Sequence, residues 1–340
     1  MLRAFLVIAA VLLLLPDWAG EPRRPLYARA PHAVFTRVAL DEDDPARVRR
    51  GRLTALGGVR MRGDDPAFGG FSAMVADANR FLMLSDAGLW FGFRMTSAFT
   101  PVDQRFGSLE EGPGSGWSRT DRDTESLTRD PASGRLWVGY ESPHAVWRYG
   151  PMLGRAQAAA TPAPMREWPQ NGGAEAMVRL RDGRFIVISE KEPAKRVSGA
   201  REALLLSGDP AAPGASIAVF AYRPPPRHSP TDAVELPDGR LLVLNRRAGF
   251  QGGFTATLVV VDTRAIRAGA VVAGEEIAQF AAPVLHDNFE ALAVTREGAA
   301  TIVWIASDDN FSRFQQSLLL KFRLEPERAN GPPSVKKAGR

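Results

Sequence analysis

The segment from Ala174 to Lys191 reads AEAMVRLRDGRFIVISEK and has the pattern of a β-hairpin. Its Asp182-Gly183 pair suits a tight turn, because such turns need positive φ angles that glycine adopts without strain. The run FIVIS after the turn is almost wholly apolar, which is typical of a strand covered on both faces. A carboxylate stands at each end of this hairpin, Glu175 before the first strand and Glu190 after the second.

The same pattern occurs four more times along the chain, about every 55 residues. Each copy has an acidic or small polar residue, then Ala or Ser, a short strand, a turn, and a second strand that ends in a polar group. The other four copies are FSAMVADANRFLMLSDAG (71–88), TESLTRDPASGRLWVGYES (124–142), TDAVELPDGRLLVLNRR (231–247) and FEALAVTREGAATIVWIASDD (289–309).

This period predicts a β-propeller, because it leaves room for two more strands after each hairpin. The stretches HAVWRYG, SIAVFAYR, TATLVVVDTR and SLLLKFRL are candidates for them. Units of four antiparallel strands are propeller blades, which pack face to face. We expect an all-β fold of six blades, the sixth formed from HAVFTRVAL and RLTALGGVRMRG near the N-terminus together with chain from the C-terminal end. The alternative is a β-sandwich or a β-helix with coincidental hairpins, and a sandwich gives no reason for such a period.

Composition excludes several classes of function. The chain has 340 residues, no cysteine and a net charge of +5, and its basic residues form no aromatic-interleaved cluster of the kind that binds nucleic acid. Without cysteine there is no disulfide, thiolate metal site or cysteine nucleophile. The four histidines share no metal-ligand spacing. We expect a monomer that binds a small anionic or ester substrate and no nucleic acid.

The N-terminus has the pattern of a signal peptide. One arginine precedes an apolar stretch from Ala4 to Leu15 that is too short to span a bilayer comfortably. We expect residues 1–20 to be a signal peptide or an uncleaved anchor, and the protein to be exported, either periplasmic or secreted, with no other contact to a membrane. Residues 21–324 then form one propeller domain, and the Pro/Gly/Lys-rich residues 325–340 a disordered tail.

The repeated polar positions predict a ring of carboxylates. The start of one strand and the end of the next lie at the same end of a hairpin, so innermost hairpins send these groups to one mouth of the central channel. The first position holds Ser72, Glu125, Glu175, Asp232 and Glu290, and the second holds Asp86, Glu141, Glu190, Asn245 and Asp308.

Crowded carboxylates repel and raise one another's pKa values unless cations neutralise them. Ca²⁺ suits oxygen-only ligands of this kind. Basic residues directly after the second positions, Lys191, Arg246 and Arg247, offer another source of positive charge, as does Arg313; they can also hold a phosphate or carboxylate of a substrate. The alternative is a structural role, in which each carboxylate accepts hydrogen bonds from the backbone and fixes one blade to the next.

The hairpins carry a family resemblance. The segments SDAG (85–88), DTESLTRDPASGRLWVGYE (123–141), GGAEAM (172–177), NFEALAV (288–294) and ASDDNFS (306–312) resemble the phytase-like family, often labelled "esterase-like activity of phytase". The resemblance runs from about residue 50 to about residue 325. It implies an exported β-propeller and hydrolysis of phosphoesters or other esters assisted by Ca²⁺.

The leading hypothesis is therefore a metal-assisted hydrolase of phosphate or other esters. By this resemblance Glu125, Glu141, Glu175, Glu190, Glu290 and Asp308 would hold Ca²⁺, with Glu290 and Asp308 the first candidates for catalytic roles. Arg246, Arg247 and Lys191 would bind the anionic substrate. Asn245 and Ser72 break the acidic ring. Two alternatives remain, a non-catalytic propeller that binds a ligand or a protein, and a lactonase-type propeller with one central Ca²⁺, for which Asn245 is the natural extra ligand.

Overall fold

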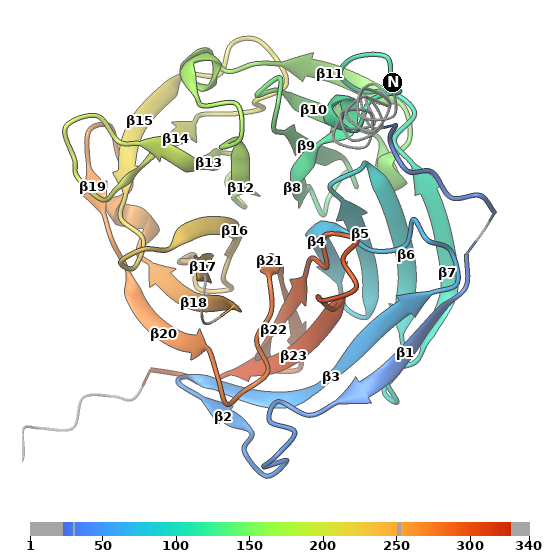
Figure 1. The fold of residues 1–340 in the computed structure, drawn as a ribbon. Helices are drawn as coiled ribbons and strands as arrows, with labels where there is room; N and C mark the ends of the chain where they lie inside the picture. The colour runs from blue at the N-terminus through green and yellow to red at the C-terminus, as the bar shows by residue number, and fades with distance from the viewer. Residues whose placement is uncertain (1–22, 30, 250–252, 328–340) are drawn as a thin grey trace, which may run out of the picture.

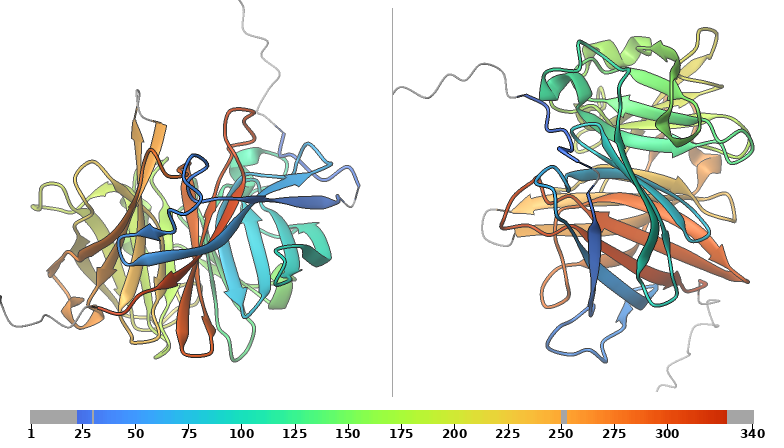
Figure 2. Two further views of the ribbon diagram at one scale, coloured as in Figure 1. Left: turned by 90° about the horizontal axis from the view of Figure 1, so that it is seen from below. Right: turned by 90° about the vertical axis from the view of Figure 1, so that its right-hand side faces the viewer.

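The computed structural model describes residues 23–29, 31–249 and 253–327, and shows a β-propeller of five antiparallel sheets around a central axis (Figure 1). The two side views show the sheets standing next to one another around the axis (Figure 2). The predicted signal segment, residues 1–20, and residues 328–340 of the predicted tail lie outside the described residues. None of the helices in the described ranges is long and apolar enough to cross a membrane.

The first three blades follow the chain in order. Blade one contains β4 (Phe71–Asp77), β5 (Arg80–Ser85), β6 (Leu89–Met95) and β7 (Pro101–Ser108). Blade two contains β8 (Thr124–Arg129), β9 (Leu136–Tyr140), β10 (Val146–Tyr149) and β11 (Ala156–Ala160). Blade three contains β12 (Ala174–Arg179), β13 (Phe185–Pro193), β14 (Arg201–Leu206) and β15 (Ile217–Tyr222), with the short β19 (Val271–Val272) parallel to β15.

The last two blades differ in how they are completed. Blade four contains β16 (Ser229–Glu235), β17 (Leu241–Gly249), β18 (Gly253–Val261) and β20 (Glu275–Phe280). Blade five combines β21 (Phe289–Glu297), β22 (Ala300–Ser307) and β23 (Leu318–Leu324) with the N-terminal strands β3 (Leu53–Gly63), β1 (Ala33–Val38) and β2 (Arg49–Arg50). Short 3₁₀ helices lie in the connections: η1 (Arg119–Arg122), η2 (Pro151–Leu153), η3 (Ala163–Glu167) and η4 (Thr263–Ala265).

The prediction of six blades is wrong. The inner strands β4, β8, β12, β16 and β21 contact one another in a closed ring, and β21 touches β4 directly, which leaves no place for another blade. The two N-terminal stretches expected to start a sixth blade are β1 and β3. Strand β3 pairs with β23, whose edge would otherwise be bare, so the chain's beginning closes the ring inside blade five.

Packing between blades explains why the second hairpin strands lack a polar face. In β17, Leu242 and Leu244 lie in the apolar cluster shared with blade five, whereas Leu241 and Val243 lie in the cluster shared with blade three. Alternate residues of one strand therefore enter two different cores. The Asp-Gly turns also form as predicted, with φ of +89° at Gly183 and +85° at Gly239.

Candidate functional site

Each hairpin brings three positions together at one mouth of the channel. The pattern is clearest in blade two, where Thr124 pairs with Tyr140 and the backbone N–H of Glu141 donates to the carbonyl of Asp123 at 2.9 Å. Asp308 donates in the same way to Asn288, Glu190 to Gly173 and Asp86 to Gly70. Each inner strand also has a register shift, and the residue left unpaired by the shift is the third position. In blade two this residue is Glu125, between Thr124 and Ser126.

These positions define the carboxylate ring, the set of eight acidic side chains at this mouth. Its members are Asp86, Asp123, Glu125, Glu141, Glu175, Glu190, Glu290 and Asp308. The structure thus brings together all six predicted metal ligands, and it adds Asp86, a predicted second-position residue, and Asp123, which the sequence reasoning missed.

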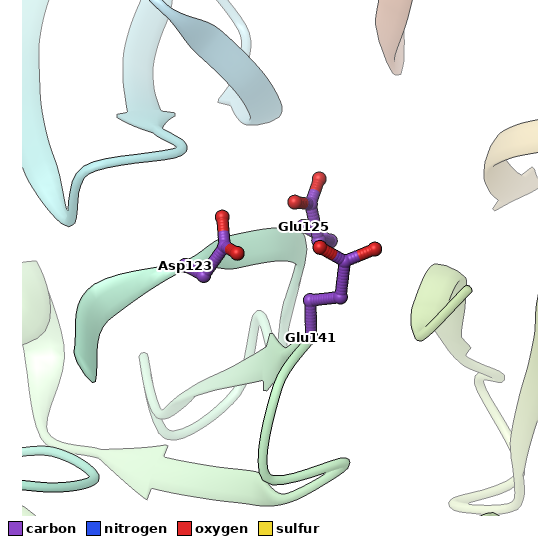
Figure 3. Close-up of side chains that lie close together, drawn as sticks. All are labelled: Asp123, Glu125 and Glu141. Atoms are coloured by element: carbon purple, nitrogen blue, oxygen red, sulfur yellow. The ribbon is translucent and has the colours of Figure 1, made fainter. Parts of the chain in front are cut away.

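Blade two supplies the densest acidic group. Ligand oxygens of Asp123, Glu125 and Glu141 all lie within 4.8 Å of one another, and Figure 3 shows the three side chains close together. In the part of the chain that the structure describes, no lysine or arginine forms an ion pair with any of the three. Three carboxyl groups this close must share protons or bind a cation. We call this group the blade-two triad.

Burial and mutual repulsion shift the titration of the ring toward high pH. Desolvation, and then the charge of Asp123, raises the pKa of Glu141 to about 8. Desolvation raises the pKa of Glu125 well above its usual range, and the charge of Glu175 adds to this. The pKa of Glu175 is raised in the same way, first by burial and then by Glu190. The ring is therefore a strong site for positive charge.

Part of that charge comes from Arg246. Its Nη2 donates to Glu190 Oε1 at 2.9 Å, and its Nη1 donates to Glu290 Oε1 and, at 2.5 Å, to Asn288 Oδ1. Lys191 Nζ lies 3.2 Å from Glu190 Oε2. Among the described residues these ion pairs reach Glu190 and Glu290 but no member of the blade-two triad. Arg119 and Lys191 act on the triad only through their charge, on Asp123 and on Glu141 respectively.

Asp86 is the blade-one member of the ring. Arg119, in the connection between blades one and two, donates to its Oδ2. Its Oδ1 is buried and has no hydrogen-bond partner among the described residues. Burial raises the pKa of Asp86 to about 7 in spite of the arginine.

Blade four departs from the predicted alignment by one residue. Strand β16 pairs Pro230 with Asn245, so its ring positions are Thr231 and Arg246 rather than the predicted Asp232 and Asn245. Asn245 is fully buried inside the blade, where its Oδ1 accepts a hydrogen bond from Tyr222 at 3.0 Å. It does not reach the mouth, so it cannot be the extra ligand of a lactonase-type site.

Asp232 has a structural role: it accepts hydrogen bonds from the backbone and joins two blades. This is the role that the sequence offered as the alternative for each carboxylate. Its Oδ2 accepts the backbone N–H of Leu292 at 2.6 Å, which joins blade four to blade five. Its Oδ1 accepts the N–H of Ala233 at 2.7 Å. Burial nevertheless raises the pKa of this carboxyl well above its usual range.

Two predicted bases lie away from the ring. Arg247 follows Arg246 in the strand, so its side chain points to the other side of the sheet. Burial lowers the pKa of His228, and the charge of Arg247 lowers it further. Arg313 is exposed on the loop after Asp308.

The opposite end of the channel has a different character. A cavity of about 430 Å³ opens there, lined by all five inner strands with an apolar floor that includes Met74, Leu127 and Leu292. The charged groups at its rim pair from blade to blade, as Arg129 does with Asp77 at 3.2 Å. Because the unneutralised titratable groups gather at the carboxylate ring, we place the candidate site there.

Comparison with known proteins supports the family suggested by the hairpin motifs. The chain matches the phytase-like family, described as "Esterase-like activity of phytase", over residues 66–311. No curated protein matches the chain.

Several solved structures are similar in outline. The PQQ-bound aldose sugar dehydrogenase of Streptomyces coelicolor gives a TM-score of 0.46 at 11% identity, covering 81% of this chain and 98% of that one. The allergen Mala s 1 of Malassezia sympodialis gives 0.43 at 12%, covering 86% and 95%. The hydrazine synthase of Kuenenia stuttgartiensis gives 0.36 at 11%, covering 72% of this chain and 57% of that one.

These structural likenesses are too weak to carry an argument about activity. The family match covers most of the chain and includes every residue of the carboxylate ring. The chain therefore belongs to the phytase-like family described as "esterase-like activity of phytase".

Proposed function

We propose that this protein hydrolyses phosphate or other esters at the carboxylate ring, with Ca²⁺ held by the blade-two triad. The observation that carries this proposal is the approach of Asp123, Glu125 and Glu141 within 4.8 Å, with no ion-paired base among the described residues. The charge of Glu175 in blade three also raises the pKa of Glu125, after the larger effect of burial.

The donor set fits calcium. The triad offers only carboxylate oxygens, the hard ligands that Ca²⁺ prefers, and no imidazole or thiolate that would favour zinc. The cation would also remove the repulsion among buried carboxylates, so binding would stabilise the folded chain. When bound, it would supply positive charge that polarises the ester and offsets the charge developing on it.

We assign the roles of catalytic base and acid to Glu290 and Asp308. Burial raises the pKa of both, but the guanidinium of Arg246 opposes the shift at Glu290, whereas the charge of Glu290 adds to the shift at Asp308. Within this pair, the charge of Arg246 favours the ionised form of Glu290, and the charge of Glu290 favours the protonated form of Asp308.

In the proposed reaction Glu290 accepts a proton from water as the water oxygen forms a bond to phosphorus or to the acyl carbon. The bond from that centre to the leaving oxygen breaks, and Asp308 donates its proton to the leaving oxygen. Lys191 is half exposed beside Glu190, so its ammonium group can also contact the anionic part of the substrate. Arg246 donates hydrogen bonds to Glu190, Glu290 and Asn288, and its role is to hold Glu190 and Glu290 in place.

An export signal completes the proposal. The apolar N-terminal stretch motivates a periplasmic or secreted location, and fractionation of cells that express a C-terminally tagged chain tests it. Recovery of the tag only in the cytoplasmic fraction would contradict export.

The activity is tested by assaying p-nitrophenyl phosphate and p-nitrophenyl acetate with added Ca²⁺ and with chelator. Turnover of at least one ester should require Ca²⁺, and Glu290→Gln should abolish it while the far-UV circular dichroism stays unchanged. Glu297→Gln is the matched control, since Glu297 lies at the other end of β21 and pairs with Lys321. Turnover that persists in chelator, or in Glu290→Gln, would sink the proposal.

One observation favours a non-catalytic binding propeller as the second candidate. Asp86, Glu190 and Glu290 are already paired with basic side chains, as that alternative predicts. The two candidates differ at the blade-two triad, which a purely structural ring would also neutralise internally. Absence of any calcium effect on melting temperature or activity would favour the binding propeller.

A further inference from the structure

Blade five repeats the geometry of the blade-two triad. Asn288, Glu290 and Asp308 occupy the positions that Asp123, Glu125 and Glu141 occupy in blade two, with Phe289 paired to Ser307 as Thr124 is to Tyr140. The same 2.9 Å backbone hydrogen bond joins the outer two members in both blades. Asparagine supplies an amide oxygen where blade two has a carboxylate, so both blades present three side-chain oxygen donors.

The two groups differ in what lies against them. The guanidinium of Arg246 contacts two of the three blade-five oxygens, Asn288 Oδ1 at 2.5 Å and Glu290 Oε1. It reaches across from blade four, where it stands at the position that is acidic in the other four blades. Its second nitrogen binds Glu190 of blade three.

We propose that Arg246 is a built-in cation that fills a second metal site, formed by Asn288, Glu290 and Asp308, and so limits the protein to one divalent cation. This inference rests on the proposed function only in taking the ring to bind divalent cations. Arg246 is not a catalytic residue in this proposal. It determines how many divalent cations bind at the carboxylate ring.

Asn288 supports this assignment independently. It is fully buried, and its Nδ2 has no hydrogen-bond partner among the described residues, while its Oδ1 faces the positive charge. A buried amide donor without a partner is unfavourable, so such residues usually have another reason to be there. An amide that uses only its oxygen behaves as a cation ligand does.

The balance of charge around Arg246 also supports a cation site in blade five. The side chain of Arg246 is 19% exposed and carries one positive charge between Glu190 and Glu290, whose side chains are 9% and 11% exposed. Removing the guanidinium would leave those carboxylates buried without a counter-charge, which is strongly unfavourable. A divalent cation is the replacement that the three oxygens of blade five can hold.

The test is a calorimetric titration of Ca²⁺ into the full chain and its variants. We expect one Ca²⁺ per chain in the wild type and two in Arg246→Gln. Arg246→Lys should keep one, because the ammonium group retains the charge. Arg247→Gln is the matched control, since the neighbouring arginine points away from the ring, and it should also keep one.

If Arg246→Gln loses its fold in chelator, near-UV circular dichroism is followed as Ca²⁺ is added back. Recovery of the native signal, together with a calcium-dependent rise in melting temperature larger than that of the wild type, supports the inference. A folded Arg246→Gln protein with the wild-type stoichiometry overturns it, as does a variant that no concentration of Ca²⁺ restores.

The outcomes separate this inference from the proposed function. If the wild type binds no Ca²⁺ and Arg246→Gln binds one, Arg246 does fill a cation site and calcium at the blade-two triad is wrong. If neither binds Ca²⁺, both are wrong. If both bind one, the proposed metal site stands and the role of Arg246 is refuted.

Discussion

Glu141 donates its backbone N–H to the carbonyl of Asp123 at 2.9 Å, so two carboxylates separated by a whole hairpin in the sequence lie side by side. The bond belongs to the hairpin ladder and would form whatever the side chains were. The fold thus forces together like charges that would otherwise separate. This cost is the physical basis for expecting a cation at the blade-two triad.

Replacing one triad carboxylate should weaken calcium binding. Glu125→Gln removes a charged ligand, and we expect the dissociation constant to rise at least tenfold, which is about 1.4 kcal/mol. In chelator the same variant should melt at a higher temperature than the wild type, because less repulsion remains. Competition with a fluorescent calcium indicator measures the first effect, and unchanged affinity would remove Glu125 from the site.

Stability of the calcium-free protein should fall as the pH rises. The pKa values of Glu141 and Asp86 are raised to about 8 and about 7, so between about pH 4 and pH 8 the folded chain binds more protons than the unfolded chain. The free energy of unfolding therefore decreases with pH across that window. Thermal melts in chelator should show a lower melting temperature at pH 8.5 than at pH 5.5, and the loss should shrink with Ca²⁺ present. A flat or rising profile in chelator would show that the ring is neutralised internally.

Asp232 should matter for stability and not for calcium. Asp232→Ala leaves the N–H of Leu292 without its acceptor at the junction of blades four and five, which we expect to cost about 1–3 kcal/mol in urea unfolding. Asp232→Asn keeps an acceptor oxygen and should cost less. Loss of calcium affinity in either variant, with the fold intact, would contradict a purely structural role.

Arg122 should hold the glycine-rich connection between blades one and two. Its buried guanidinium donates to the carbonyls of Leu109 and Glu110, and also to those of Pro113 and Asp121. Arg122→Met removes these bonds, and we expect a loss of about 3 kcal/mol, since hydrogen bonds to charged groups are the stronger kind. Limited proteolysis within residues 111–118 should become faster, and an unchanged cleavage rate would argue that the loop is held by other contacts.

Most of the fold could be predicted from the sequence of the hairpin repeats. The Asp-Gly turns at Gly183 and Gly239 and the apolar strands beside them predict five inner hairpins, and all five form. The blade count was not predictable from the hairpins alone. Whether the segment Leu53–Gly63 starts a blade or completes one depends on the free edge of β23, which is a tertiary property.

The positions of the ring side chains were predictable except where the register of a strand mattered. When the sequences of blades three and four are aligned on their Asp-Gly turns, instead of on the nearest acidic residue, Thr231 aligns with Glu175 and Arg246 aligns with Glu190. That alignment was available in the sequence, and it would have identified Arg246 as the ring residue. Asp123 was missed because it precedes the strand, in a position where two other blades have glycine.

Calcium binding at the blade-two triad is best tested by calorimetric titration of Ca²⁺ into the wild-type protein after treatment with chelator, paired with a thermal melt. We expect one Ca²⁺ per chain, a raised melting temperature and the loss of both effects in Glu141→Gln. No heat of binding and identical melts with Ca²⁺ and with chelator would contradict it.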